Sequence, residues 1–161
     1  MRAAVAFACL SLMLAGCALS KPDNAYSVEE VLADISSAQS ELDGRTVSIH
    51  GWLGECWGTN CAIFSTLEDA EKVGAYQELP EEEWMPAFNR SLSVGSKDAF
   101  DNAALFMQFS EVVIIGEINS TWHKPPDESG NQFGCLDRCD DIRPQSVRKI
   151  IFEEIPCAIS H

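Results

Sequence analysis

The alternation of apolar and polar residues predicts a chain built mainly of β-strands, with helices between them. The clearest example is residues 46–56, where every second side chain is apolar over most of the segment, as in a strand buried on one face. Further strands are predicted at 60–66, 92–94, 111–122 and 147–155. The residues that define the first strand are Val47, Ile49 and Leu53 on one face, and Ser48, His50 and Trp52 on the other.

Two segments have the periodicity of helices. Ser27 and Glu30 stand at the spacing of a capping box, which predicts a helix over residues 28–39. A second helix is expected to open at residues 96–98 and to run to about Met107. Residues 67–89 show no clear period, although Pro80 and the glutamates after it are typical of a first helical turn, which Pro86 should cut short. Residues 123–145 are rich in Pro, Gly and Asp and predict a loop.

The order of these elements resembles the OB-fold. The resemblance lies in residues 44–53, in the helix at 97–109 and in residues 112–118, and as a pattern it covers roughly residues 44–155. It implies a mainly β protein with helices, in which an N-terminal helix precedes a five-stranded Greek-key barrel. The chain is also similar to small bacterial envelope proteins of OB type that have no assigned activity. The alternative is another α+β sandwich with a mixed sheet.

The N-terminus has the layout of a secretory signal. Arg2 precedes an apolar run at 3–15, and Leu14-Ala15-Gly16-Cys17 resembles the lipobox of bacterial lipoproteins. By this resemblance the chain is cut before Cys17, which is acylated. Residues 1–16 are then a signal peptide, 17–25 the lipidated cysteine with its tether, and 26–161 a single OB-like domain. The alternative is an ordinary signal peptide cut near residues 18–20.

Charge and the lipid together predict where the protein lies and what it avoids. The formal net charge is −14, and removal of residues 1–16 takes away one of the 11 basic residues and none of the 25 acidic ones, which leaves −15. Such a surface repels nucleic acid, and it also repels anionic lipid head groups. The lipid on Cys17 is therefore the expected contact with a membrane. The resemblance implies a lipid-anchored protein of the bacterial envelope that faces the periplasm. Ala18-Leu19 after Cys17, with no aspartate, resembles the signal for passage to the outer membrane.

The mature chain contains five cysteines besides Cys17. The envelope is oxidising, so local disulfides Cys56–Cys61 and Cys135–Cys139 are expected. In the OB-like arrangement the two pairs lie in loops at the same end of the barrel, which leaves open a cross-loop disulfide or a zinc site of four thiolates. Their spacings are looser than the C-x2-C pairs of zinc ribbons and do not favour thioredoxin-type chemistry. Cys157 is left without an assigned partner.

The same loops carry aromatic and acidic residues that predict a binding surface. Exposed tryptophans stack on sugars or on peptide side chains, and nearby carboxylates accept hydrogen bonds from hydroxyls and amines or hold a cation. The alternative is that the tryptophans plug the end of the barrel and that the acids are solvated. The candidate residues are Trp52, Trp57, Trp122, Glu55, Asp137, Asp140 and Asp141.

The sequence lacks several common motifs of catalytic and cofactor sites. It has no G-x-S-x-G, no phosphate-binding loop, no G-x-G-x-x-G and no H-E-x-x-H. We therefore expect a binding or scaffold module without cofactor or catalytic activity, whose partner is an envelope protein or a glycan. The alternatives are a cysteine-based metal-binding or redox-sensing protein, and a structural component of an envelope assembly.

Overall fold

The computed structural model describes residues 24–57, 61–123 and 140–150, so the predictions for Cys17, Cys135, Asp137, Cys139 and Cys157 lie outside the described residues. Within these ranges the chain is an α+β protein with a six-stranded open sheet and four α-helices, none of them long and apolar enough to span a membrane. The elements in chain order are β1 (Tyr26–Ser27), α1 (Val28–Ile35), β2 (Thr46–Leu53), β3 (Ala62–Phe64), α2 (Leu67–Gly74), α3 (Glu81–Phe88), β4 (Leu92–Ser93), α4 (Asp98–Ala104), β5 (Glu111–Ile118), a 3₁₀ turn (Thr121–His123) and β6 (Ile142–Lys149).

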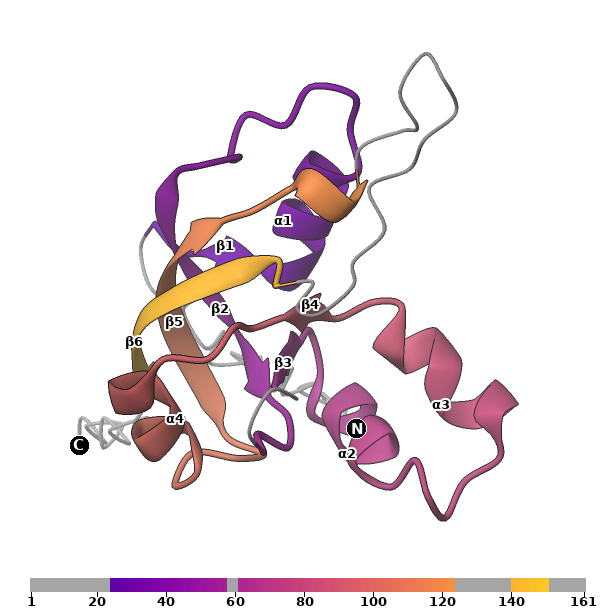
Figure 1. Cartoon of the computed structure of the whole chain (residues 1–161). Helices are drawn as coiled ribbons and strands as arrows, with labels where there is room; N and C mark the ends of the chain where they lie inside the picture. Colours follow the sequence, from indigo (N-terminus) through magenta and orange to yellow (C-terminus); the bar gives the residue numbers. More distant parts are fainter. Residues whose placement is uncertain (1–23, 58–60, 124–139, 151–161) are drawn as a thin grey trace, which may run out of the picture.

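Strand β2 lies at the centre of the sheet. The strand order is β4-β3-β2-β5-β6, and β1 adds a short parallel pairing to β2, in which Tyr26 lies opposite Ile49. The other neighbours along this order are antiparallel. The longest regular ladder joins β2 to β5 through seven residue pairs, from Thr46 opposite Glu117 to Trp52 opposite Glu111 (Figure 1). The sheet extends from this ladder through β3 and β4 on one side and through β6 on the other.

The two edge strands of the sheet, β4 and β6, touch at one point. Val94 and Ile142 form an isolated parallel bridge, and the Gly95 amide donates to the Ile142 carbonyl at 2.8 Å. The Asp141 amide donates to the Ser93 carbonyl at 3.1 Å. The contact does not continue as a ladder within the described residues, so the sheet is open with its edges drawn together at this seam, and the predicted closed five-stranded barrel is not seen.

One apolar core lies between the sheet and two helices. The predicted alternation of β2 is confirmed, because Val47, Ile49 and Leu53 are buried and the residues between them, apart from Gly51, are only partly buried. Helix α1 lies toward the end of the sheet where β5 terminates, and α4 toward the end where β5 begins (Figure 1). Both helices turn apolar side chains into the same cluster, namely Val28, Val31 and Ile35 from α1 and Phe100 and Ala104 from α4.

The predicted N-terminus of α1 is confirmed, and its predicted end is wrong. The Ser27 hydroxyl accepts from the Glu30 amide at 3.2 Å, and the Glu30 carboxylate accepts from the Ser27 amide at 2.6 Å. The helix ends at Ile35 and not near residue 39. The reason is Asp34, whose carboxylate accepts the backbone amides of residues 41 and 42 and so holds the chain in a loop.

The acidic segment 67–89 forms two short helices. Thr66 caps α2 by accepting from the Asp69 amide at 3.1 Å. Helix α3 begins after Pro80, as predicted, but it continues through Pro86 to Phe88. A proline removes one amide donor from a helix, and this helix is short and partly exposed, so the loss did not end it where the sequence predicted.

The predicted end of β5 and the predicted start of β6 are also wrong. Strand β5 stops at Ile118, so that Trp122 lies in the 3₁₀ turn, and β6 covers residues 142–149 where a loop to 145 and a strand from 147 were expected. Pro144 lies opposite Gly116, next to a shift in the register between β5 and β6. Since proline cannot donate to the ladder, the strand bulges there, and its apolar residues lose the two-residue period.

Gly51 is the position at which β2 can least accept a side chain. A Cβ there would lie 2.6 Å from the Phe64 carbonyl oxygen and 2.9 Å from Val28 Cγ2. We expect Gly51→Ala to lower the free energy of unfolding by about 2 kcal/mol, because backbone on one side and α1 on the other cannot both give way. Urea unfolding measures the change. Ser48→Ala, on the opposite face of the same strand, is the control and should change stability by about 0.5 kcal/mol or less. Equal effects of the two substitutions would contradict the close packing of α1 on β2.

Candidate functional site

The described candidate residues fall into two groups at opposite ends of the β2–β5 ladder. Trp52 lies opposite Glu111 at one end, and Trp57 follows it, whereas Trp122 and Asp141 adjoin the Ile118–Ile142 pair at the other. Six residues of ladder separate the ends, which is about 20 Å. The expectation that these loops meet at one end is therefore not met for their described residues. The reason is that β2 and β5 are antiparallel, so the chain leaves them in opposite directions.

At the first end, Trp57 is held in an exposed position. Cys56 and Cys61 are joined by a disulfide, as predicted, and Cys56 is buried while the next side chain, Trp57, is 64% exposed. The indole Nε1 donates to the Glu55 carboxylate at 2.9 Å. The disulfide therefore fixes the backbone on which the indole stands, and Glu55 restricts the rotation of the ring. Two of the predicted ligand-binding residues are thus in contact with each other.

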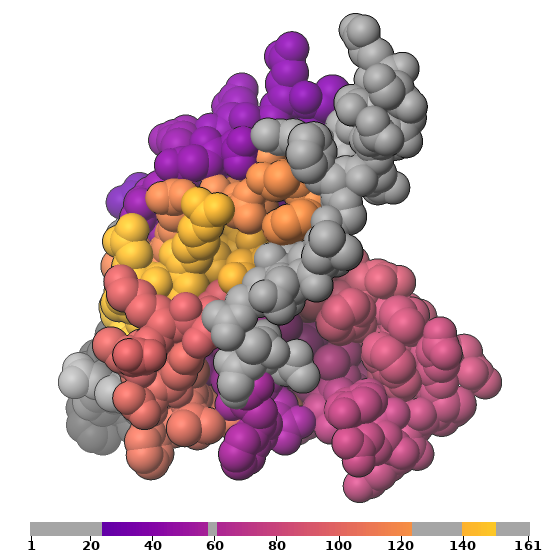
Figure 2. Space-filling view, in the orientation of Figure 1, coloured from indigo at the N-terminus to yellow at the C-terminus, as the bar shows by residue number. Residues whose placement is uncertain are grey.

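The turn between α4 and β5 packs beside this loop and adds further apolar side chains. Gln108 donates through Nε2 to the Cys56 carbonyl at 3.0 Å, and the Phe109 amide donates to the Leu53 carbonyl at 2.8 Å. Figure 2 shows the two segments side by side at one edge of the molecule. Phe106 is 89% exposed, the most of any large apolar residue in the described ranges. We call Trp57, Leu105, Phe106 and Phe109 the Trp57 surface.

The sequence reasoning missed three members of the Trp57 surface. The sequence pattern predicts that the helix continues into residues 105–109, and it gives no expectation that their apolar side chains are exposed. The available signal was the placement of two phenylalanines off the apolar stripe of that helix. Trp52, which was predicted to belong to the site, is partly buried on β2 beside Phe64 and Glu111, and it does not join the exposed group.

At the second end, Asp141 is part of the seam between β4 and β6. Its side chain is only 9% exposed, and Oδ2 accepts from the Ser93 amide at 2.8 Å and from the Ser93 hydroxyl at 2.9 Å. His123 Nε2 lies 2.9 Å from the other oxygen, Oδ1. The carboxylate stands between the serine and the histidine, so the order differs from a catalytic triad, in which histidine occupies the middle. Asp141 holds the two strand ends together.

The remaining candidates at this end are also engaged in the structure. Asn119 pairs with the chain at Asp140 and Asp141, donating from its side chain to the Asp140 carbonyl at 3.0 Å and from its amide to the Asp141 carbonyl at 2.9 Å. The Trp122 ring is partly buried, and its Nε1 is buried without a hydrogen-bond partner in the part of the chain that the structure describes. Trp122 therefore does not offer an open face comparable to that of Trp57.

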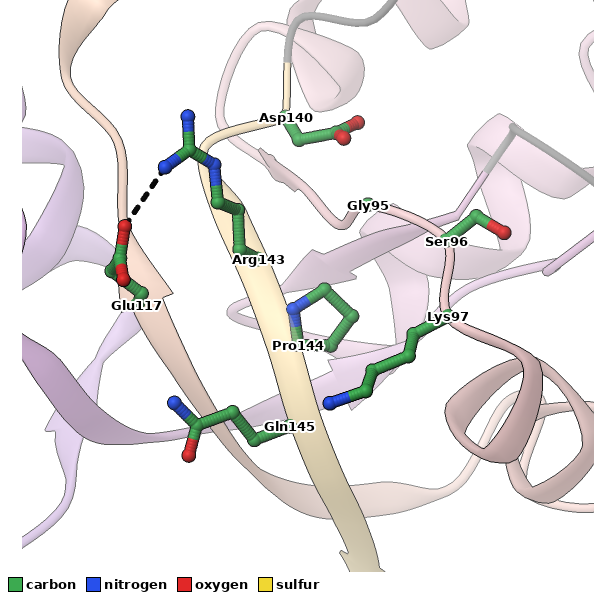
Figure 3. Close-up of a pocket in the computed structure, with 8 residues that line it drawn as sticks. All are labelled: Gly95, Ser96, Lys97, Glu117, Asp140, Arg143, Pro144 and Gln145. Atoms are coloured by element: carbon green, nitrogen blue, oxygen red, sulfur yellow. Dashed lines mark hydrogen bonds and ion pairs between the residues drawn. The ribbon is translucent and has the colours of Figure 1, made fainter.

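A shallow groove of about 320 Å³ lies between the start of α4 and β6. Figure 3 shows the Lys97 side chain extended along one wall toward Gln145, with Arg143 paired to Glu117 at 2.9 Å on the opposite side. Asp140 lines the same groove, and its carboxylate lies over Gly95, where there is no Cβ to meet it. The groove carries both signs of charge and is open to solvent, so its geometry favours no single class of ligand.

The disulfide bears on the metal-binding and redox alternatives for the one cysteine pair that the structure describes. In the Cys56–Cys61 disulfide neither sulfur is available as a thiolate, which a zinc ligand or a redox nucleophile must be. Across residues 24–57, 61–123 and 140–150, no group of three or more His, Cys, Asp or Glu side chains is placed to hold a metal ion.

Comparison of the chain with protein-family models, with curated proteins and with solved structures found no match. What the two ends can do chemically is therefore inferred from their own residues. One end presents a fixed, exposed aromatic group next to a carboxylate, and the other presents a buried, internally paired carboxylate. Of these two groups, the one at Trp57 is the more open to contact with another molecule.

The pairing of His123 with Asp141 predicts a pH dependence of stability. The hydrogen bond from the imidazole to Asp141 raises the pKa of His123 above its ordinary value of 6.5, and partial burial opposes this rise. Because the folded-state pKa is the higher one, the contribution to the free energy of unfolding is fully present below pH 6.5 and is lost as the pH rises through the folded-state value.

Urea unfolding of the wild type and of His123→Gln between pH 5.5 and 8.5 checks this expectation. The stability difference between the two proteins should be largest at the acid end and should shrink toward pH 8.5. In the Asp141→Asn background the same histidine substitution should give a difference that does not change with pH. A wild-type advantage that grows with increasing pH would contradict the assignment.

Proposed function

We propose that this protein is a lipid-anchored binding module of a bacterial envelope, which faces the periplasm and contacts its partner through the Trp57 surface. Its body is a single OB-like domain that serves as a rigid scaffold. It has no catalytic role. The partner is an envelope protein or a glycan, and the outer membrane is the favoured location.

The OB-like assignment is supported by strand order and by the seam. Strands β2 to β6 follow the OB sequence of five strands with a helix, α4, between the third and the fourth. The parallel bridge between Val94 and Ile142 brings together the strands that would close such a barrel. Gly116 and the adjacent bulge give β5 and β6 the local bend that closure requires.

The observation that carries the proposed binding role is the exposure of Trp57 on a constrained loop. A buried indole is worth far more to stability than an exposed one, so this position gains nothing for the fold. The disulfide and the contact with Glu55 reduce the freedom that the side chain would lose on binding. Aromatic side chains presented in this way are typical anchors of interfaces and of sugar-stacking sites.

The lipid anchor is supported by the sequence around Cys17 and by the charge of the chain. A net charge of −14 opposes adsorption to anionic head groups, so a lipid would be needed to keep the domain at the membrane. Residues 17–25 then link the lipid to β1, which begins at Tyr26 in the middle of the sheet. Such a tether leaves the Trp57 surface free to face away from the bilayer.

Photocrosslinking from position 57 tests the proposed contact surface. A photoreactive phenylalanine analogue at Trp57, in the full chain in the envelope of the producing bacterium, should give a discrete crosslinked species. The matched control is the same analogue at Thr46, an exposed residue at the other end of the ladder. Trp57→Ala should keep the unfolding midpoint of the wild type, because the side chain is exposed, and should abolish partner capture. Equal crosslinking from positions 57 and 46 would reject the surface.

Membrane fractionation of Cys17→Ser tests the anchor separately. Without a thiol to acylate, the protein should move from the membrane fraction to the soluble fraction. Cys9→Ser, in the apolar run ahead of the lipobox, is the control and should leave the protein in the membrane fraction. Retention of Cys17→Ser at the membrane would show that something other than this lipid holds the protein.

A further inference from the structure

Residues 67–89 form an arm at the edge of the sheet, made of α2, α3 and the turn between them. Helix α3 packs mainly against α2, and α2 in turn packs against β3 and β2 (Figure 1). Arg90 ties the base of the arm by pairing with Asp69 at 3.0 Å. Only Ala70 in α2 and Ala87 in α3 are fully buried, so the arm contributes little to the core. Contacts within the arm itself hold its two helices together.

Those contacts include a row of three aromatic rings. Tyr76 and Trp84 meet edge to face with centroids 6.0 Å apart, and Trp84 and Phe88 do the same at 6.2 Å. Tyr76 is 48% exposed and Phe88 50% exposed. Trp84 and Phe88 stand four residues apart on α3, so they share one helix face. The row is therefore ordered by ring contacts and is open to solvent at both ends.

The arm that carries this row is rich in carboxylates, and most of them form no ion pair within the described ranges. The arm carries seven acidic side chains and a single basic one, Lys72, which pairs with Glu68 at 2.6 Å. Asp69 is paired with Arg90. Glu81 lies three residues before Trp84, on the same side of α3. The exposed carboxylates that form no ion pair within the described ranges are Glu71, Glu78, Glu81, Glu82 and Glu83.

We propose that the arm is a docking surface for a basic segment of a partner protein, which inserts apolar side chains against Tyr76, Trp84 and Phe88 while its lysines or arginines face the carboxylates. Aromatic anchors within a charged rim are the usual composition of a protein interface. The charge selects the occupant. A second copy would bring a second acidic arm into contact with the first, and an anionic bilayer would be repelled in the same way.

A peptide selection on the full-length protein in detergent micelles tests the proposal. Random dodecapeptides are selected for binding, and the affinity of the enriched peptides is measured for the wild type and for variants. We expect enriched sequences with lysine or arginine next to leucine, phenylalanine or tryptophan. Phe88→Ser should weaken their binding about tenfold, and Glu78→Gln with Glu81→Gln about fivefold. The affinity should also fall with increasing salt.

Matched controls separate this surface from the general acidity of the chain. Glu41→Gln with Asp98→Asn removes the same charge elsewhere, and Asp98 opens α4 as Glu81 opens α3. This pair should leave the affinity within twofold of the wild type. Trp57→Ala should also leave it unchanged, so failure of the arm proposal and failure of the Trp57 surface are distinguishable. Amide exchange in α2 verifies that Phe88→Ser keeps the arm folded.

Several outcomes would overturn the proposal. Equal weakening by the two charge-removing pairs would mean that the peptides bind the acidic surface at large. Selected peptides without basic residues, or binding that ignores Phe88→Ser, would reject the arm as their site. Dimerisation of the wild type that Phe88→Ser abolishes would assign the aromatic row to a second copy. Flotation of the Cys17→Ser protein with anionic vesicles, lost on the same substitution, would assign it to a lipid surface.

Discussion

The pairing of β2 on both sides is the constraint on which the rest of the structure depends. Strand β2 lies between β3 and β5 and is antiparallel to both, and β1 pairs with β2 in addition. Antiparallel pairing forces the segment after β2 to lie beside the segment before β5, which brings Trp57 to the turn that carries Phe106. The same rule brings the end of β5 to the start of β6 at the far end, where Asp141 meets Ser93. The two ends thus acquire different chemistry from one ladder.

Features that depend on neighbouring residues could be predicted from the sequence. The capping box at Ser27 and the alternation in β2 both follow from spacings of two to four residues, and both are confirmed. The extent of β6 could not be read in the same way. Pro144 and the bulge beside it shift the inward positions from Ile142 and Pro144 to Val147, so the period of two is broken. A sequence pattern that assumes an unbroken strand places such a segment in a loop.

The residues of the candidate site show the same difference between local and long-range information. Trp57 was identified because its loop is bounded by two cysteines, which is a local signal. The sequence predicts that Asp141 binds a ligand, but in the structure it binds Ser93, which lies 48 residues away and is brought close by the seam between the edge strands. The local signal for Phe106 is weak: it lies off the apolar stripe of α4, and its exposure depends on the helix ending at Ala104. Burial of polar groups and exposure of apolar ones are both decided by contacts that are distant in sequence.

The exposed aromatic groups and the acidic charge have opposite effects on association between copies of the chain. The Trp57 surface and the arm adjoin, because the Phe109 ring lies against Gly74 at the end of α2. Exposed apolar side chains that lie close together favour association between copies unless something opposes it. A net charge of −14 supplies that opposition between copies, and it acts in the opposite sense on a cationic partner. The same carboxylates that would repel the arm of a second copy would attract the proposed basic segment of a partner, so one set of charges would act against the first contact and in favour of the second.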